Sequence, residues 1–298
     1  MKVRVGFGLG TAGSRGGIER FESLVDGLER HGFDSLWLSE RITGGAVDPL
    51  MGLAVAAGRT TRLKLGTSVL VVPGRNPAVL AKELASLDHL SRGRLLPAVG
   101  LGVRDEGEQQ AFGVNRKERG AWFDEVVPLL RRFWTGEPVE HHGPRFDYSG
   151  ITVRPTPVQQ PLEMWLGGAA PSELRRVGRL GDGWLPSFTT AAAAAEGRVV
   201  VEQAAAEADR SIDPEHWGAL VVYHDGPLPD RLKALLAARR PDHDPADVVP
   251  STHAELRVHL QRFVDVGFSK FVLIAAAEPD DWDAELSALA EEVLSMQV

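Results

Sequence analysis

The chain has 298 residues, no cysteine, and 33 basic against 41 acidic side chains, for a formal net charge of −8. The missing cysteines exclude disulfides, thiolate catalysis and cysteine-ligated metal. The negative charge argues against a nucleic-acid partner, because no net positive field collects phosphates. No window approaches the roughly 18 uninterrupted apolar residues of a membrane span, and the glycine-rich start does not resemble a signal peptide. We therefore expect a cytoplasmic protein without a membrane partner.

Short apolar runs alternate with segments of helical periodicity along the chain. Expected strands cover residues 3–7, 35–38, 63–72, 95–101, 162–166, 217–223 and 267–274, and expected helices include 49–58, 172–180, 189–210 and 232–239. This alternation gives about eight βα units, the number that closes a barrel. We predict an α/β fold, a (β/α)8 TIM barrel that forms one domain over residues 1–298.

The segment from Leu63 to Gly102 is the most specific βαβ unit. Asn76 can cap its helix through the side-chain oxygen, and Pro77 at the first helical position loses no hydrogen bond. Both strands end in small residues, where parallel strands point their carboxyl ends. Small residues there let a flat ligand approach the backbone.

These residues resemble the luciferase-like monooxygenase superfamily, and within it the oxidoreductases that use coenzyme F420, a deazaflavin. The shared pattern is Thr67-Ser68-Val69, Asn76-Pro77-Ala78, Gly93-Arg94-Leu95 and Gly100-Leu101-Gly102. The resemblance implies hydride transfer between F420 and a small organic substrate. An FMN-dependent monooxygenase on the same barrel is the alternative, and a non-catalytic cofactor-binding barrel is a third interpretation.

The resemblance also implies which residues hold the cofactor. Glu40, Ser68 and Val69 would contact the ring system, with a cis peptide between Ser68 and Val69. Leu101 and Gly102 would line the edge of the ring. The phosphate would bind to Gly167, Gly168 and Ala169, because glycines before a helix start expose N–H groups at the positive end of the helix dipole.

The reacting end departs from the family at two positions. Arg41 stands where F420-using relatives usually have histidine, and Val103 stands where sugar-phosphate-oxidising relatives have a catalytic glutamate. Arginine stays charged and is a poor general acid, although it can stabilise negative charge. Our catalytic candidates are therefore Glu40, Arg41 and Glu106, where either Asp105 or Glu106 could substitute for the glutamate missing at Val103. The alternatives are that Arg41 only pairs with Glu40 at the surface and that the acidic loop is solvated.

Residues 136–161 are interrupted by prolines and glycines. They predict an insertion, with a hairpin, that lies over the carboxyl-terminal face of the barrel. His141 and His142 lie within it, but neighbouring side chains on an extended chain point opposite ways, so we expect no metal site. The resemblance further implies a homodimer that packs through early helices.

Overall fold

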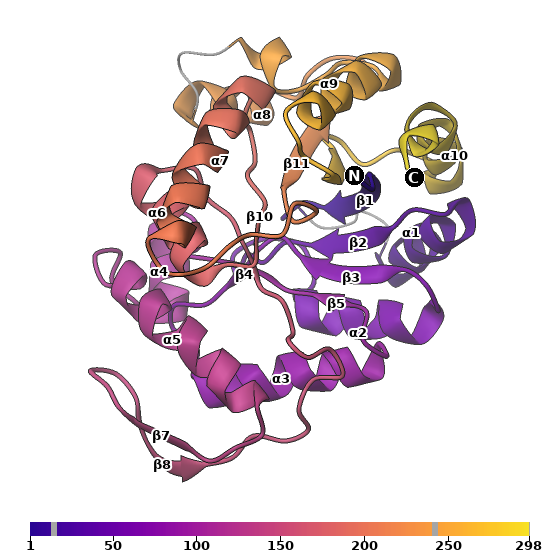
Figure 1. Cartoon of the computed structure of the whole chain (residues 1–298). Helices are drawn as coiled ribbons and strands as arrows, with labels where there is room; N and C mark the ends of the chain where they lie inside the picture. Colours follow the sequence, from indigo (N-terminus) through magenta and orange to yellow (C-terminus); the bar gives the residue numbers. More distant parts are fainter. Residues whose placement is uncertain (13–16, 240–243, 298) are drawn as a thin grey trace.

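The computed structural model describes residues 1–12, 17–239 and 244–297, and its strands and helices alternate as the sequence predicts (Figure 1). Parts of the loops expected after the first strand and after residue 239 lie outside these residues. The strands are β1 (Arg4–Leu9), β2 (Ser35–Leu38), β3 (Lys64–Thr67), β4 (Leu70–Val71), β5 (Leu95–Leu96), β6 (Ala98–Gly100), β7 (Val139–His142), β8 (Asp147–Ile151), β9 (Trp165–Leu166), β10 (Gly183–Trp184), β11 (Gly218–Tyr223) and β12 (Lys270–Ala275).

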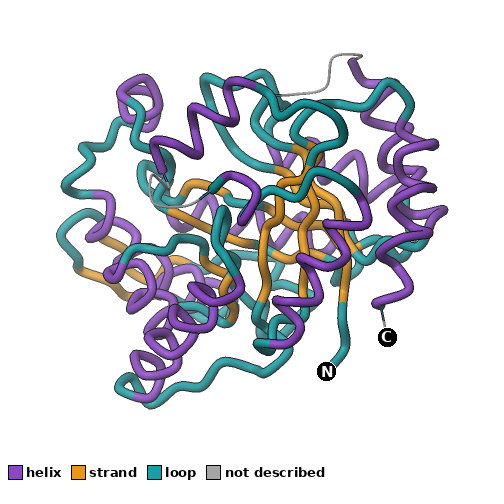
Figure 2. The backbone as a smooth tube through the Cα atoms, turned by 90° about the horizontal axis from the view of Figure 1, so that it is seen from above, coloured by secondary structure: helices purple, strands orange, loops and turns teal. Residues whose placement is uncertain are grey.

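The helices lie outside the strands (Figure 2). They are α1 (Gly17–His31), α2 (Pro49–Arg59), α3 (Pro77–Leu90), α4 (Glu106–Phe112), α5 (Arg119–Trp134), α6 (Pro171–Leu180), α7 (Ala191–Ala206), α8 (Asp230–Arg239), α9 (His253–Asp265) and α10 (Trp282–Val293). Within the described ranges, none of them is both long enough and apolar enough to cross a bilayer.

The parallel strands form a closed ring. One sheet has the order β11-β12-β1-β2-β3-β5 and the other β10-β9-β6-β4. Two strands of the ring run through both sheets: β3 of the first sheet continues into β4 of the second, and β5 continues into β6. Parallel bridges from Trp184 to Trp217 and from Ser187 to Leu220 join β10 to β11. Counted this way, the described residues contain eight ring strands, which confirms the predicted barrel.

Two tryptophans fill the barrel interior, and each lies over a glycine on a neighbouring strand. Trp37 and Trp165 are almost fully buried in one apolar cluster. A Cβ added at Gly66 would lie 2.3 Å from the Trp37 ring, and one added at Gly183 would lie 2.5 Å from the Trp165 ring. The indoles fit only because these strand positions carry no side chain.

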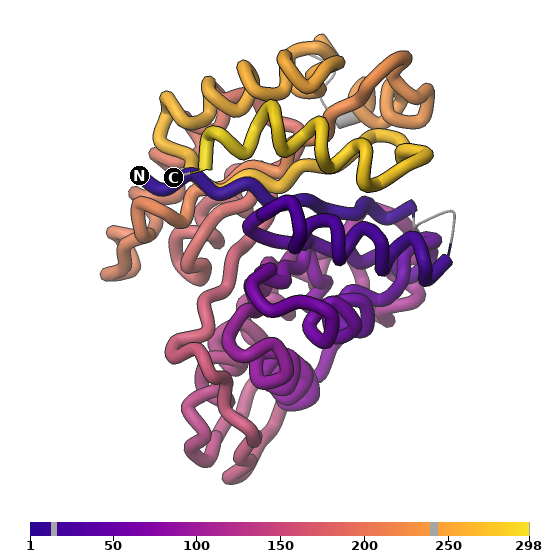
Figure 3. The backbone as a smooth tube through the Cα atoms, turned by 90° about the vertical axis from the view of Figure 1, so that its right-hand side faces the viewer, coloured from indigo at the N-terminus to yellow at the C-terminus, as the bar shows by residue number. Residues whose placement is uncertain are grey.

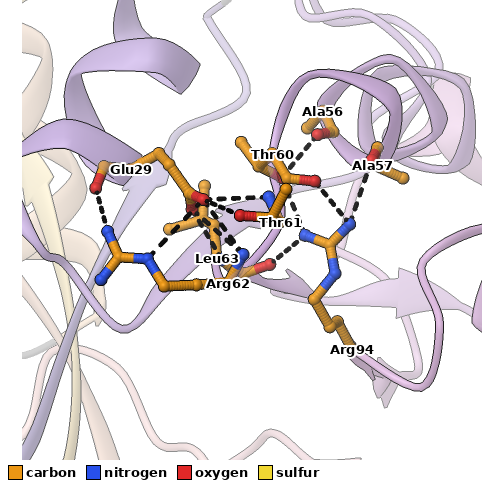
Figure 4. Close-up of polar contacts among 8 residues, drawn as sticks. All are labelled: Glu29, Ala56, Ala57, Thr60, Thr61, Arg62, Leu63 and Arg94. Atoms are coloured by element: carbon orange, nitrogen blue, oxygen red, sulfur yellow. Dashed lines mark hydrogen bonds and ion pairs between the residues drawn. The ribbon is translucent and has the colours of Figure 1, made fainter.

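Hydrogen bonds to Glu29 and Arg94 fix the loop that enters β3 at the amino-terminal edge of the barrel (Figure 4). The Glu29 carboxylate accepts bonds from the backbone N–H groups of Thr61 and Leu63 at 2.9 and 2.8 Å. The Arg94 guanidinium donates to the carbonyl oxygens of Thr60 and Leu63 at 3.0 and 2.7 Å. Two side chains, Glu29 and Arg94, thus fix the main chain of this loop.

The C-terminal segment beyond α10 closes on the first strand. Figure 3 shows the first and last segments of the chain side by side. The Val5 N–H donates to Gln297 Oε1 at 2.9 Å, and Gln297 Nε2 donates to the Gly32 carbonyl oxygen at 3.1 Å. Residues nearly three hundred positions apart are therefore bonded directly.

The inserted segment contains the expected hairpin, formed by antiparallel β7 and β8. Its predicted location is wrong, because the hairpin packs along α5 and the start of α3. The Phe146 ring lies 5.7 Å from that of Trp122, and the Tyr148 ring 5.3 Å from that of Phe133. The Tyr148 hydroxyl also donates to Asn76 Oδ1 at 3.2 Å. These aromatic contacts with the helices hold the hairpin against the side of the barrel.

The two histidines of this hairpin bind different carboxylates. His141 Nε2 lies 3.0 Å from Glu125 Oε1, and His142 Nδ1 lies 2.6 Å from Asp147 Oδ1. In the part of the chain that the structure describes, no group of three or more histidine, aspartate or glutamate side chains is arranged to hold a metal ion.

The tryptophan–glycine contacts generate a stability prediction. Gly66→Ala should lower the free energy of unfolding by about 1–3 kcal/mol, because the added methyl group overpacks the buried Trp37 ring. Urea unfolding followed by tryptophan fluorescence measures this change. Gly58→Ala is the matched control: Gly58 lies in α2 with no atom within 4 Å of an added Cβ, so the substitution should stabilise the helix by roughly 0.5–1 kcal/mol. An unchanged midpoint for Gly66→Ala would contradict the packing argument.

Candidate functional site

The carboxyl ends of β6 and β9 meet the segment between β3 and β4 around Val69. A Cβ added at Gly100 would lie 2.6 Å from Val69 Cγ2, and one added at Gly167 would lie 3.2 Å from Val69 Cγ1. The peptide between Ser68 and Val69 is cis, as expected from the resemblance. The structure therefore brings together Val69, the last residue of β6 and the glycine loop after β9, which are far apart in the sequence.

The end of β2 holds the segment between β3 and β4 in place. The Ser39 hydroxyl donates to the Ser68 carbonyl oxygen at 2.9 Å and lies 3.2 Å from the Ser68 hydroxyl. The Ser68 N–H donates to the Leu38 carbonyl oxygen at 2.8 Å. Thr67 Oγ1 bridges to the next strand, accepting from the Ala98 N–H at 3.0 Å. Each residue of Thr67-Ser68-Val69 thus contributes a contact to this rim.

Glu40 follows Ser39 and carries a buried charge, with its side chain 2% exposed. Its carboxylate accepts a hydrogen bond from the Val71 N–H at 2.7 Å and another from the Arg75 guanidinium. Arg75 Nε also donates to the Val71 carbonyl oxygen at 2.9 Å. Burial raises the pKa of Glu40, and the Arg75 charge opposes that rise. The role of Glu40 at the cofactor ring stays a prediction, and sequence reasoning missed Arg75.

Arg41 points toward α4 and not toward Glu40. Its Nη2 lies 3.3 Å from Asp105 Oδ2, and its Nε lies 3.8 Å from Glu108 Oε1. The alternative of an Arg41–Glu40 pair is therefore wrong. The Arg41 side chain remains 37% exposed, so the guanidinium can still meet a ligand at the rim.

The acidic segment after Val103, predicted as a loop, contains helix α4. Asp105 caps this helix by accepting from the Glu108 N–H at 3.0 Å, and Gly113 ends it with φ +65°. An aspartate cap, acidic residues in the first turn and a terminal glycine were visible in the sequence as helix signals. Glu106, our catalytic candidate, is exposed in the first turn of α4.

Glu108 is the buried acid of this segment, and sequence reasoning missed it. Its carboxylate accepts bonds from the Thr43 N–H and the Thr43 hydroxyl, both at 2.7 Å. Burial alone would raise the pKa of Glu108, but these bonds hold it below its ordinary value. Glu108 therefore ties the loop after β2 to α4 and sets where Arg41 lies.

The Gly167-Gly168 loop leads into α6 and presents two backbone N–H groups to one anion. The N–H groups of Ala169 and Ala170 both donate to Glu173 Oε2 at 3.0 Å. Gly168 has φ +105°, and its carbonyl oxygen accepts from Trp184 Nε1 at 2.8 Å. Glu173 thus caps the start of α6, and its carboxylate satisfies both N–H groups.

Arg119, at the start of α5, binds the main chain that follows β6. Its Nη1 donates to the carbonyl oxygens of Leu101 and Gly102 at 3.2 and 2.9 Å. Its Nε is buried and has no hydrogen-bond partner. Burial lowers the pKa of Arg119, and the charges of Arg116 and Arg104 lower it further. Arg119 thus orients the backbone of Leu101 and Gly102.

Comparisons with known proteins identify the family of this chain. The sequence pattern of the luciferase-like monooxygenase family matches residues 3–240. A protein of Beutenbergia cavernae, named F420-dependent glucose-6-phosphate dehydrogenase, is 30% identical over 305 residues, covering 89% of each chain. The protein of that name from Kineococcus radiotolerans is 29% identical over 289 residues, covering 84% of this chain and 85% of its own.

The chain therefore belongs to the luciferase-like monooxygenase family. A solved structure of an F420-dependent secondary alcohol dehydrogenase in complex with an F420–acetone adduct superimposes with a TM-score of 0.82. The two share 18% sequence identity, and all of each chain is covered. At that identity the likeness establishes the barrel fold.

The Glu40–Arg75 pair generates a second prediction. Arg75→Met should destabilise the protein by about 3–5 kcal/mol, because it leaves the buried Glu40 charge without its partner. Urea unfolding measures the change. The double variant Glu40→Gln/Arg75→Met should recover a large part of the loss, since no uncompensated charge remains. If the loss of stability in the double variant equals the sum of the losses in Arg75→Met and Glu40→Gln, the two groups are not coupled.

Proposed function

We propose that this protein is an F420-dependent oxidoreductase acting on a small organic substrate in the cytoplasm. The observation that carries the proposal is the meeting of three rim segments at Val69, next to a glycine loop whose amides already hold an anion. A planar ring with a phosphate arm matches that combination. The names of the relatives in Beutenbergia and Kineococcus support the same cofactor.

Each predicted binding residue has a place in this proposal. Ser68 and Val69 support the face of the ring system, and Glu40 lies beneath the same rim. Leu101 and Gly102 line the edge of the ring. Gly167, Gly168 and Ala169 take the phosphate. When bound, F420 supplies a carbon that gives or accepts a hydride, and the protein orients the substrate and excludes water.

The reacting end is built from Arg41 and α4. Arg41 keeps a positive charge at the rim, where it can stabilise negative charge on a substrate oxygen. Glu106 is exposed in the first turn of α4 and is our candidate for proton exchange. Val103 cannot perform acid–base chemistry, so this end differs from that of an enzyme with glutamate there.

An FMN-dependent monooxygenase remains the second candidate, because the matching family includes monooxygenases by its description. FMN also has a planar ring and a phosphate. A barrel that binds cofactor without catalysis is the third candidate, and the departures at Arg41 and Val103 favour testing it.

Cofactor titration tests the three candidates. F420 fluorescence should be quenched saturably by the protein, and FMN should bind more weakly. Gly168→Ala should weaken F420 binding at least tenfold, because φ +105° is strained for a residue with a side chain and the added Cβ would lie 2.8 Å from Glu173 Cβ, so the loop must shift. Gly226→Ala is the matched control, with φ +86° and no atom within 4 Å.

Binding of FMN alone would overturn the choice of F420. Tight F420 binding without turnover across carbonyl, alcohol and unsaturated substrates would favour the non-catalytic barrel.

We also propose that the protein is a homodimer that packs through α2 and α3. Met51 and Val55 on α2 are 65% and 39% exposed, and Val79 on α3 is 55% exposed. Sedimentation analysis should give a dimer mass for the wild type and a monomer mass for Met51→Glu, because a charge replaces apolar contact area. Val199→Glu, at a 64% exposed residue of α7, should leave the dimer intact. A monomeric wild type would contradict the proposal.

A further inference from the structure

The Glu173 carboxylate binds the main chain directly after the Gly167-Gly168 pair. Its Oε2 accepts both the Ala169 and the Ala170 N–H at 3.0 Å. It also lies directly over Gly168, because a Cβ added there would be 2.7 Å away. Glu173 sits in the first turn of α6, where the helix dipole favours a negative group.

A cofactor phosphate needs the same N–H groups. Each backbone N–H has one proton to donate, and a phosphate beside a carboxylate would add repulsion between like charges. The carboxylate and the phosphate therefore exclude each other at the Ala169 and Ala170 amides.

We propose that Glu173 is an internal competitor of the cofactor phosphate: its carboxylate caps α6 in the free protein and is displaced when a phosphate-bearing ligand binds. This inference rests on the proposed function for the identity of the ligand. Displacement costs α6 little, because the phosphate takes over the N–H groups that the carboxylate releases. The Glu173 side chain is only partly buried, so water can solvate the released carboxylate.

If Glu173 competes with the phosphate, removing its carboxylate should raise the affinity only for ligands that carry a phosphate. Glu173→Ala removes the competitor, so the variant should bind F420 about tenfold more tightly than the wild type. A deazaflavin lacking the phosphate arm should bind both proteins equally, because it does not need the shared amides. The free variant should melt at a lower temperature, since α6 has lost its cap.

A second helix of the chain offers a matched control. Glu255 occupies the corresponding first turn of α9, where its Oε2 accepts the Ser251 N–H at 2.9 Å. Glu255→Ala also removes a capping carboxylate and should lower the melting temperature. Because α9 is not part of the glycine loop, this variant should bind F420 as the wild type does.

Two measurements test the inference independently. The first compares F420 affinity by fluorescence titration in the wild type, Glu173→Ala and Glu255→Ala. The second follows melting temperature against inorganic phosphate, which should stabilise Glu173→Ala at concentrations where the wild type does not respond. Tighter F420 binding and phosphate protection confined to Glu173→Ala would support the competition.

Equal or weaker F420 binding by Glu173→Ala would overturn the inference while leaving the proposed function intact. If the wild type and both variants fail to bind F420, the proposed function fails instead. In that case the melting measurement still decides the role of Glu173. If phosphate raises the melting temperature of Glu173→Ala alone, the competition is supported; if phosphate raises that of all three proteins equally, the competition is overturned.

Discussion

The rim of the barrel depends on the buried carboxylate of Glu40. A buried charge is tolerated only when its hydrogen bonds and counter-charge are supplied, and here Val71 and Arg75 supply them. The carboxylate thereby joins the end of β2, strand β4 and the approach to α3. Because β4 begins directly after the Ser68–Val69 peptide, the position of Val69 between the glycine loops follows from the same interaction.

Charged side chains hold the loops at both edges of the barrel. At the amino-terminal edge, Glu29 and Arg94 bind main-chain atoms of the loop entering β3. At the carboxyl-terminal edge, Glu40 and Glu108 accept main-chain N–H groups, and Arg41 pairs with Glu108 across two loops. Because the two sets of residues are separate, substitutions at the carboxyl-terminal edge can change the site while the amino-terminal edge keeps its hydrogen bonds.

The sequence predicted features that depend on local chemistry. The capping of α3 by Asn76 is one, since Asn76 Oδ1 accepts from the Ala78 N–H at 2.9 Å. The family resemblance added the cis peptide before Val69. Long-range pairs were not predictable: no spacing rule joins Glu108 to Thr43, and Arg75 precedes a helix with nothing to mark its partner. The location of the hairpin was mispredicted for the same reason. Its aromatic residues indicate that the segment packs against another surface, but they do not indicate which surface.

The filling of the barrel interior by indole rings has an optical consequence. Trp37 and Trp165 lie inside the ring of strands, shielded from water and surrounded by the strands that carry the rim. Their emission comes from fixed positions below the mouth of the barrel. A light-absorbing tricyclic compound bound above them would accept energy from the excited indoles and lower the tryptophan fluorescence. The fluorescence of the protein itself therefore reports whether the site is occupied, without an attached dye.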